Sequence, residues 1–384
     1  MMGTSLLIVS ATISALTWTY LLLGRGWFWR IRKLVLPSEA AAGIMGRVAV
    51  IVPARNEVEV IGRSIGSLLS QTGLEHIHIF LVDDGSDDGT AEAARMAAGK
   101  AGKDDCLTVI QGQPLPPGWT GKLWALHQGV QQARILGPRF YLFTDADIVH
   151  PADSIATLAA LADGGAYDLA SLMVRLRCQT VPERLLIPAF VFFFFKLYPP
   201  AWIASDRHAT AGAAGGCILI HPQALEGADG LEAIRGEIID DCALARAVKR
   251  SGGKVWLGLA GETASIRAYG SFANVGRMIS RSAFNQLRHS TLLLLAALLG
   301  LAITYLLPPA LLFSSQEIPV ALGAGAWLAM TAAYLPMVRY YRLHPLWALT
   351  LPLAAIFYMG ATAHSAVRYW SGQGGEWKGR VQDR

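Results

Sequence analysis

FLVDDGSDDGT at residues 80–90 and YLFTDADIVHP at residues 141–151 share one pattern. In each stretch a short apolar run, rich in β-branched and aromatic residues, ends in paired carboxylates, which predicts a buried strand leading into an acidic loop. The carboxyl ends of such strands are where open α/β sheets bind ligands. Carboxylates crowded at one sheet edge repel each other, so we expect a divalent cation and a hydroxyl-rich ligand to join them there. The acids concerned are Asp83, Asp84, Asp145 and Asp147.

Around these stretches, strand-like and helix-like segments alternate along the chain. Short apolar runs predict strands at Val48–Val52, Ile77–Val82, Leu107–Ile110 and Phe140–Thr144. Apolar residues at helical spacing predict helices at Glu59–Ser70, Thr90–Ala98 and Leu123–Ile135. This alternation predicts an α/β fold with a mainly parallel sheet and right-handed crossovers.

The composition is too apolar for an ordinary soluble domain. Hydrophobic residues make up 53% of the 384 residues, charged residues only 16%, and the mean hydropathy is +0.37. Four runs approach the roughly 20 residues that a helix needs to cross a bilayer. They are Ser5–Leu23, Thr291–Phe313, Ile318–Val338 and Leu346–Val367. Buried core helices are the alternative for all four, and a re-entrant hairpin is a further alternative for the last two.

Basic residues give the expected orientation in the membrane. Residues 1–5 carry no basic side chain, whereas Arg25, Arg30, Arg32 and Lys33 follow the first run. The positive-inside rule then places the segment after it in the cytosol. We therefore expect an N-terminal anchor at 1–36, a cytosolic domain at 37–290 and a membrane region of about three helices with a tail at 291–384. The bases of the tail contradict three further crossings: Arg368, Lys378, Arg380 and Arg384.

Charge and cysteine content narrow the range of partners. The net charge of +5 is concentrated beside the apolar runs, which favours contact with a membrane surface. No stripe of bases and aromatics resembles a nucleic-acid-binding motif, so no nucleic-acid partner is expected. The chain has no CxxC pair, which argues against a zinc site or a disulfide framework. Its cysteines are Cys106, Cys178, Cys217 and Cys242.

Two turns are candidates for binding a nucleotide. Pro53–Glu57, PARNE, follows the first predicted strand, and an ordinary loop with Asn56 as a helix N-cap is its alternative. In Asp83–Thr90, DDGSDDGT, short acids suit ribose hydroxyls, and the glycines permit positive φ angles. A plain turn, with Ser86 or Asp88 capping the next helix, is the alternative. Lys122 at the start of the third helix suits a phosphate, although a solvated lysine explains it equally well.

Two acid pairs are further candidates for a functional site. Asp145 and Asp147 are hard oxygen donors, which suit Mg²⁺ or Mn²⁺. The pair Asp240-Asp241 occurs later in the chain, in DDCAL. A pair of acids favoured by a helix dipole is the alternative for it.

Taken in order, the motifs VIVPARNE, DDGSDDGT, DAD and DDCAL resemble those of family 2 glycosyltransferases with the GT-A fold, over residues 47–289. The resemblance implies a nucleotide-diphosphate sugar donor and inversion at the anomeric carbon. It implies that Asp83 and Asp84 hold the nucleoside, with Glu57, Pro53 and Arg55 beside them. Asp147 would touch the metal and Asp145 the metal, sugar or ribose. Asp241 would be the catalytic base, with Asp240 next to it.

Processive family members carry a Gln-x-x-Arg-Trp signature, which is absent from the corresponding stretch, Arg277–Leu287. Arg281 in this stretch is nevertheless expected to approach the diphosphate. The missing signature and the small number of spans argue against polymer synthesis.

Two segments between the acid motifs concern the acceptor. Leu185–Ala204 contains Lys196 and two adjacent prolines, and we expect an interfacial helix with Phe192–Phe195, Tyr198 and Trp202 at the lipid surface. A buried core segment is the alternative. Gly212–Ile220, GAAGGCILI, is expected to let the acceptor approach the backbone.

Within the family, the chain most resembles the bacterial hopene-associated glycosyltransferases. The similarity lies in the single N-terminal span and in the runs IIDDCALARAVKRSGGKV and SRSAFNQLRHS. It implies a multi-pass protein of the bacterial inner membrane that glycosylates a hopanoid or similar lipid. The alternatives are a short-chain polysaccharide synthase and a non-enzymatic membrane scaffold that binds sugar nucleotides.

Overall fold

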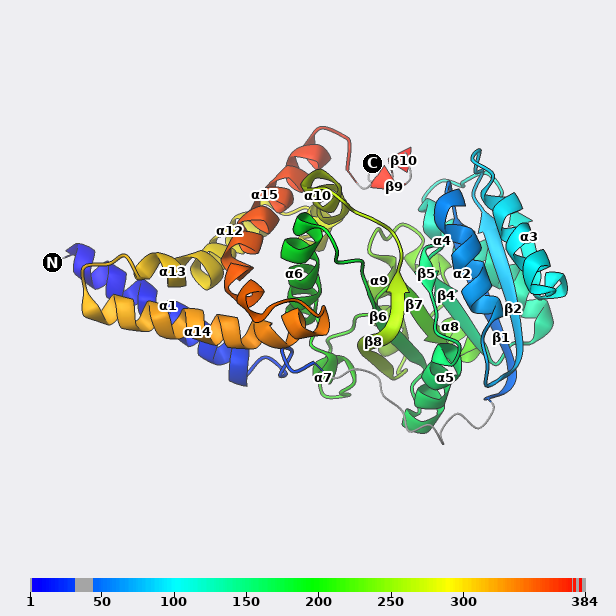
Figure 1. The fold of residues 1–384 in the computed structure, drawn as a ribbon, viewed down its shortest axis with the longest axis horizontal. Coiled ribbons are helices and arrows are strands. Elements are labelled where there is room, and N and C mark those ends of the chain that lie inside the picture. Colours follow the sequence, from blue (N-terminus) through cyan, green and yellow to red (C-terminus); the bar gives the residue numbers. More distant parts are fainter. Residues whose placement is uncertain (1, 32–43, 375, 378–379, 382–384) are drawn as a thin grey trace.

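The computed structural model describes residues 2–31, 44–374, 376–377 and 380–381. The molecule is elongated, with an α/β domain at one end and a bundle of long helices at the other (Figure 1). The expected boundary between residues 36 and 37 lies outside the described residues. So do four of the bases used to predict orientation: Arg32, Lys33, Lys378 and Arg384.

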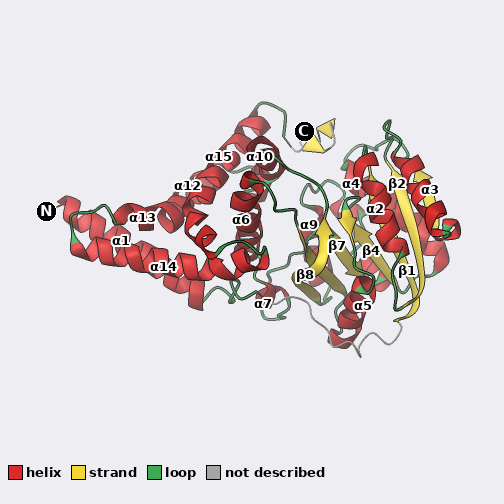
Figure 2. Ribbon diagram, in the orientation of Figure 1, coloured by secondary structure: helices red, strands yellow, loops and turns green. Residues whose placement is uncertain are grey.

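An eight-stranded sheet with the order β3-β2-β1-β4-β7-β6-β8-β5 forms the centre of the α/β domain (Figure 2). Its strands are β1 (Ile44–Ala54), β2 (Leu74–Asp83), β3 (Leu107–Gln111), β4 (Phe140–Thr144), β5 (Ile148–Val149), β6 (Leu169–Arg175), β7 (Cys217–Ile220) and β8 (Val255–Ser265). The pairs β1–β2, β2–β3, β1–β4 and β6–β8 are parallel. Strand β7 runs antiparallel to β4 and β6, and β5 runs antiparallel to β8. The expected mainly parallel sheet is confirmed.

Helices cover both faces of this sheet. Those of the α/β domain are α2 (Val58–Leu69), α3 (Thr90–Ala101), α4 (Gly121–Ala133), α5 (Ser154–Gly165), α8 (Pro222–Gly227) and α9 (Asp240–Arg250). One apolar cluster joins the sheet to α2, α3 and α5, through side chains such as Ile61 and Leu158. A second cluster joins the other face to α4 and α9 and continues into the long helices, from Ile51 to Tyr334. The α/β domain and the helical region therefore share one core.

The remaining helices build the other end of the molecule. They are α1 (Met2–Leu23), α6 (Val181–Leu197), α7 (Pro200–Ile203), α10 (Phe272–Ser280), α11 (Ala283–Gln286), α12 (Thr291–Leu301), α13 (Leu307–Leu311), α14 (Glu317–Tyr340) and α15 (Leu351–Trp370). A π-helical turn, Ala302–Leu306, separates α12 from α13. Helices α1 and α14 lie side by side at the end away from the sheet (Figure 1). The last described strands, β9 (Glu376–Trp377) and β10 (Arg380–Val381), form a small hairpin.

In the described part of the chain, five helical segments are long and apolar enough to cross a membrane. Four of them correspond to the apolar runs identified in the sequence, and the fifth contains α6 and α7. They are Ser5–Leu23, Val181–Ile203, Thr291–Leu311, Glu317–Tyr340 and Pro345–Trp370.

The aromatic side chains of α6 do not lie where the sequence predicted. Phe192, Phe193 and Phe195 are 1%, 8% and 3% exposed, so placing these rings at a lipid surface was wrong. The physical reason is aromatic packing between helices. Phe192 packs edge-on against Tyr334, and Phe193 against Tyr305 and Tyr358.

Candidate functional site

Three parallel neighbours in the sheet bring the predicted acids together. Strands β2, β1 and β4 end at the same edge, with Ala54 of β1 in register with Asp83 of β2. Asp83 ends β2 and Asp84 follows it, Glu57 lies in the loop after β1, and Asp145 and Asp147 lie in the loop after β4. Most of these acids are nearly buried: Asp83 and Asp84 are 4% exposed, Asp147 is 6% exposed and Glu57 is 8% exposed.

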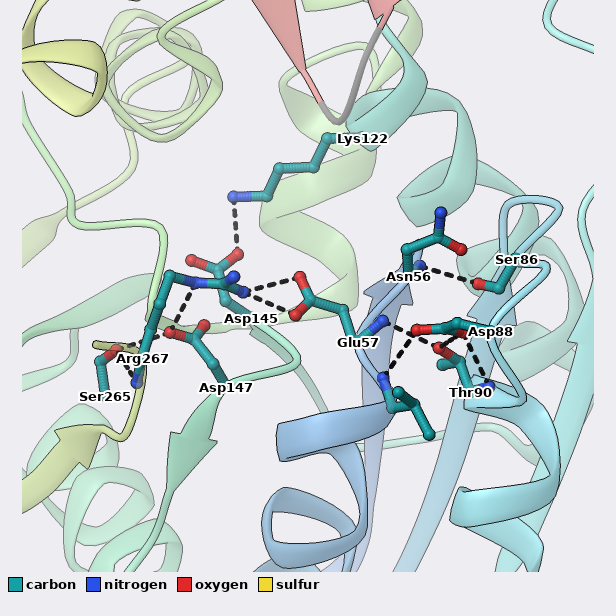
Figure 3. A network of polar contacts seen from close by, with 11 residues as sticks. Asn56, Glu57, Ser86, Asp88, Thr90, Lys122, Asp145, Asp147, Ser265 and Arg267 are labelled. Atoms are coloured by element: carbon teal, nitrogen blue, oxygen red, sulfur yellow. Dashed lines mark hydrogen bonds and ion pairs between the residues drawn. The ribbon is translucent and has the colours of Figure 1, made fainter. Parts of the chain in front are cut away.

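Hydrogen bonds hold the first two of these loops together (Figure 3). The Asn56 amide donates to Ser86 Oγ at 3.0 Å, and the Asn56 side chain accepts from the Asp87 amide at 3.1 Å. Asn56 has a φ of 52°, in the left-handed region that Asn tolerates. Asp88 accepts from the amide of Val58 at 3.0 Å, at the start of α2. The turn at Asp83–Thr90 therefore supplies a hydrogen-bond acceptor for a backbone amide in the first turn of α2.

Within the second turn, the two leading acids have different surroundings. Asp83 Oδ1 accepts from the Ser86 amide at 3.0 Å, which closes the turn. Arg55 donates to the Asp84 carbonyl and lies 3.8 Å from the Asp84 carboxylate. Arg55 therefore holds the Asp83–Thr90 turn in place through its contacts with Asp84.

Lys122, in the first turn of α4, joins two of the predicted acid motifs. Its Nζ lies 2.9 Å from Asp145 Oδ1 and 3.2 Å from Asp240 Oδ2. Burial alone would lower the pKa of this ammonium, but Asp145, Asp240 and Asp241 raise it well above its usual range. Lys122 is therefore a fixed positive charge between the DAD loop and α9, and the solvated lysine of the alternative interpretation does not occur here.

Asp240 and Asp241 form the first turn of α9. Asp241 Oδ2 accepts from the Gly215 amide at 2.8 Å, and Oδ1 accepts from the Cys242 amide at 2.7 Å. Burial and the neighbouring Asp240 raise the pKa of Asp241 to about 6, against the opposing effects of Lys122 and the two amides. A carboxylate with this pKa remains ionised at neutral pH and is a stronger base than an ordinary aspartate. The site can therefore accept a proton at Asp241.

The most extensive ionic contact of the site involves a residue that sequence reasoning missed, Arg267. Its Nη2 donates to both Glu57 carboxylate oxygens, at 2.6 and 2.7 Å, and its Nε donates to Asp147 Oδ2 at 3.2 Å (Figure 3). Ser265 Oγ donates to the same Asp147 oxygen at 2.5 Å. The only local signal is an arginine two residues after β8, because both acids lie far away in the sequence.

A buried carboxylate from α6 fixes the loop that carries Arg267. Glu183 is fully buried, and its Oε1 accepts from the amides of Tyr269 and Gly270 at 3.0 and 3.2 Å. Its Oε2 accepts from the amides of Gln179 and Thr180 at 2.9 and 3.0 Å. The start of this membrane-length helix therefore positions one wall of the site.

Two other predicted residues lie at the border of the site. Pro53 lines a cavity together with Lys122, Asp145, Asp240 and Asp241. Arg281 is exposed just after α10 and forms no contact with the acids that the structure describes. Its charge nevertheless acts on Tyr269. Burial and Asp147 raise the pKa of Tyr269 to about 12, and the charges of Arg267 and Arg281 act in the opposite direction. The structure thus brings the predicted residues together, with Arg281 at the periphery.

The donor set fits a divalent metal that a ligand helps to hold. Asp145 and Asp147 offer carboxylate oxygens, and both contacts of Asp147 are to Oδ2 alone. Among the described residues no three His, Cys, Asp or Glu side chains are placed to hold an ion by themselves. Mg²⁺ is commonly bound through one or two carboxylates plus substrate phosphates, so these residues fit such a metal when a diphosphate completes its shell.

Comparison with known proteins agrees with this geometry. Residues 49–227 match the family model described as Glycosyl transferase family 2. The chain is similar to the mannosyltransferase PcManGT from Pyrobaculum calidifontis, solved in complex with GDP-Man and Mn²⁺. The TM-score is 0.54 at 18% identity, over 91% of this chain and 98% of that chain. At this identity the likeness shows a shared fold, a GT-A-like Rossmann arrangement.

Two further solved structures are more distant. Glucosyl-3-phosphoglycerate synthase from M. tuberculosis has a TM-score of 0.39 at 18% identity, over 65% of this chain and 82% of that chain. TarS from S. aureus has a TM-score of 0.41 at 16% identity, over 84% of this chain and 55% of that chain. No curated protein sequence matches this chain.

Proposed function

We propose that this chain, whose residues 49–227 match the family 2 glycosyltransferase model, moves one sugar from a nucleotide-diphosphate sugar to a membrane lipid. One observation supports a lipid as the acceptor. Glu183, at the start of membrane-length α6, holds the loop of Arg267, which in turn contacts Glu57 and Asp147. Because the helical bundle builds part of the site itself, an acceptor lying among these helices would reach the sugar without leaving the membrane.

The acids at the sheet edge bind the donor in this proposal. Asp83, Asp84 and Glu57 hold the nucleoside, and Lys122 and Arg281 approach the diphosphate. Asp147 and Asp145 would hold Mg²⁺ or Mn²⁺, which supplies positive charge against the negative charge that grows on the departing diphosphate.

Asp241 is the base of an inverting displacement. It takes the proton of the acceptor hydroxyl while the acceptor oxygen forms its bond to the anomeric carbon. On the opposite face the bond from that carbon to the diphosphate oxygen breaks, and the nucleoside diphosphate leaves with the electron pair. The amides of Gly215 and Cys242 hold the carboxylate in place. General-base catalysis of this kind typically contributes about 10²- to 10⁴-fold in rate.

The membrane arrangement follows the basic residues of the sequence. We place the catalytic domain in the cytosol and the protein in a bacterial inner membrane, because Arg25 and Arg30 follow the first span. The resemblance to hopene-associated enzymes supports a polycyclic, hopanoid-like lipid as the acceptor.

The test uses purified protein in lipid nanodiscs with Mn²⁺ or Mg²⁺ and a panel of UDP- and GDP-sugars. Release of nucleoside diphosphate is measured with and without extracted bacterial lipid. We expect one donor to give release that lipid stimulates and that Asp241→Asn lowers by about 10²- to 10⁴-fold, whereas Asp105→Asn, at an exposed site, leaves it unchanged. Donor binding without release by the wild-type protein would instead favour the sugar-nucleotide-binding scaffold.

A further inference from the structure

A neutral polar pair lies where the end of α6 meets α11. The Gln286 amide nitrogen donates to the Tyr198 hydroxyl at 2.8 Å, and that hydroxyl lies 3.0 Å from Gln286 Oε1. Gln286 is exposed and Tyr198 is half-buried, so the pair is accessible from outside the protein core. Tyr198 directly follows α6, the helix whose Glu183 holds the loop of Arg267.

This pair is connected to the base through Cys242. The Cys242 thiol donates to the Ala213 carbonyl at 3.6 Å; burial and Asp241 raise its pKa and Tyr198 opposes them, so both groups neighbour this thiol. The Tyr198 ring also packs on the backbone of Gly212, where a Cβ would come within 3.0 Å of the ring. The segment from Gly212 to Gly215 therefore touches Tyr198 at one end and Asp241 at the other.

Lys249, at the other end of the helix that carries Asp241, fixes the chain that follows Tyr198. Its Nζ donates to the carbonyls of Trp202, Ile203, Ser205 and Thr210, at 3.2, 2.7, 3.0 and 2.9 Å. Helix α9 is thus joined to the end of α6 near both of its own ends. These contacts of Lys249 form a frame between α9 and the end of α6, which fixes the position of Asp241 relative to Tyr198 and Gln286.

The chemistry of the pair identifies the group that it would bind. A phenol and a carboxamide each donate and accept, so together they match an alcohol, which has one hydrogen to donate and lone pairs to accept. A phosphate would instead bring negative charge beside Asp240 and Asp241, and the nearby Lys122 is already paired with Asp145 and Asp240. A phosphate that is fully ionised also has no proton for Asp241 to take.

We propose that Tyr198 and Gln286 bind the reacting hydroxyl of the acceptor, so that this enzyme glycosylates an un-ionised lipid alcohol rather than a lipid phosphate. The inference rests on the proposed transfer of sugar to a lipid. In the complex, the acceptor hydroxyl takes the place of one partner in the Tyr198–Gln286 contact and presents its proton to Asp241.

The experiment compares n-dodecanol with n-dodecyl phosphate, each added to the full-length protein in nanodiscs with its donor. Sugar transfer to each probe and hydrolysis of the donor by water are measured in parallel. The wild-type protein is expected to glycosylate dodecanol at least about tenfold faster than dodecyl phosphate. Preference for the phosphate, or donor hydrolysis without transfer to dodecanol, overturns the inference and leaves the proposed transferase activity intact. Absence of nucleotide release with every donor contradicts the proposed function itself.

Two variants test whether Tyr198 and Gln286 bind the acceptor hydroxyl. Tyr198→Phe keeps the ring on Gly212, and Gln286→Met keeps the side-chain length, so each removes hydrogen bonding with little change in shape. Each is expected to raise the KM for dodecanol about 5- to 10-fold, the effect of one lost hydrogen bond, with donor hydrolysis within about twofold of wild type. Tyr20→Phe, at an exposed tyrosine of α1, is the matched control. Unchanged KM values in both variants, or equal loss of transfer and hydrolysis, would refute the assignment.

Discussion

Arg267 and Glu57 form a two-contact ion pair, at 2.6 and 2.7 Å, between the loop that Glu183 of α6 positions and a loop at the carboxyl edge of the sheet. The same guanidinium holds Asp147, the acid expected to touch the metal. Arg267 therefore supplies positive charge to this carboxylate when no metal is bound. If Asp147 also holds the metal, as proposed, arginine and metal compete for one side chain.

Replacing this arginine tests the competition. Arg267→Gln leaves two nearly buried carboxylates without their cation, and we expect a loss of about 2 kcal/mol in stability. This is less than the roughly 3–5 kcal/mol for a fully buried pair, because Arg267 is partly exposed. Thermal melts in EDTA and in Mn²⁺ are the measurement. Mn²⁺ should raise the melting temperature more in the variant than in wild type, because the rival of the metal for Asp147 has gone.

Arg342→Gln is the control for this experiment. Arg342 pairs with Glu262 at 3.1 Å but both side chains are exposed, so removing it should change neither the melting temperature nor the response to Mn²⁺. An equal Mn²⁺ shift in Arg267→Gln and wild type would show that Arg267 and the metal do not share Asp147.

The raised pKa of Asp241 predicts a pH dependence. The base works only when ionised, so kcat/KM for the acceptor should rise with pH through about 6 and then level off. Below about pH 6, a single ionisation lowers kcat/KM tenfold for each unit by which the pH falls. Rates measured from pH 4.5 to 8 would check this. In Asp241→Asn, residual activity should be about 10²- to 10⁴-fold lower, with donor binding retained. The acidic limb of the pH profile, which is the fall in rate below about pH 6, should be absent from this variant. An unchanged acidic limb would assign the ionisation to another group.

Removing Lys122 should move the acidic limb. Lys122 lowers the pKa of Asp241, so in Lys122→Met the pKa should rise further and the limb should shift above pH 6. The same pH series on the variant measures the shift. Lys122→Arg keeps the charge and should keep the limb close to its wild-type position. A limb that stays in place in Lys122→Met would mean that this ammonium does not control the base.

Local patterns in the sequence predicted the sheet edge well. The expected strand at Phe140–Thr144 coincides with β4, and Val48–Val52 and Ile77–Val82 lie inside β1 and β2. Parallel neighbours end together, so the acids that follow these strands had to meet. The residues needed for this prediction lie within a few positions of one another.

Contacts over long sequence distances could not be predicted in the same way. Arg267 meets Glu57 across 210 positions, and nothing near Arg267 in the chain marks it as a ligand of the site. Phe192, Phe193 and Phe195 were wrongly placed at the lipid because a phenylalanine run beside a lysine has the composition of an interfacial helix. Their partners, Tyr305, Tyr334 and Tyr358, lie more than a hundred positions further on.

Lys249 offers a stability test that also reports on the acceptor side. Its ammonium donates to four backbone carbonyls of the chain after α6, and hydrogen bonds to charged groups contribute about 1.5–3 kcal/mol. In Lys249→Met those carbonyls lose their donor, and we expect about 2 kcal/mol of destabilisation. That corresponds to a fall of about 4–8 °C in the melting temperature of a domain of this size.

The same variant should affect transfer more than donor binding, because Lys249 fixes the segment beside Tyr198 and is remote from the donor acids. Melting curves, nucleotide binding and transfer to lipid would be measured on one preparation. Lys254→Met, at an exposed lysine four residues after Arg250, should leave all three unchanged. A Lys249→Met protein with wild-type melting and transfer would show that the frame between α9 and the end of α6 does not depend on this ammonium.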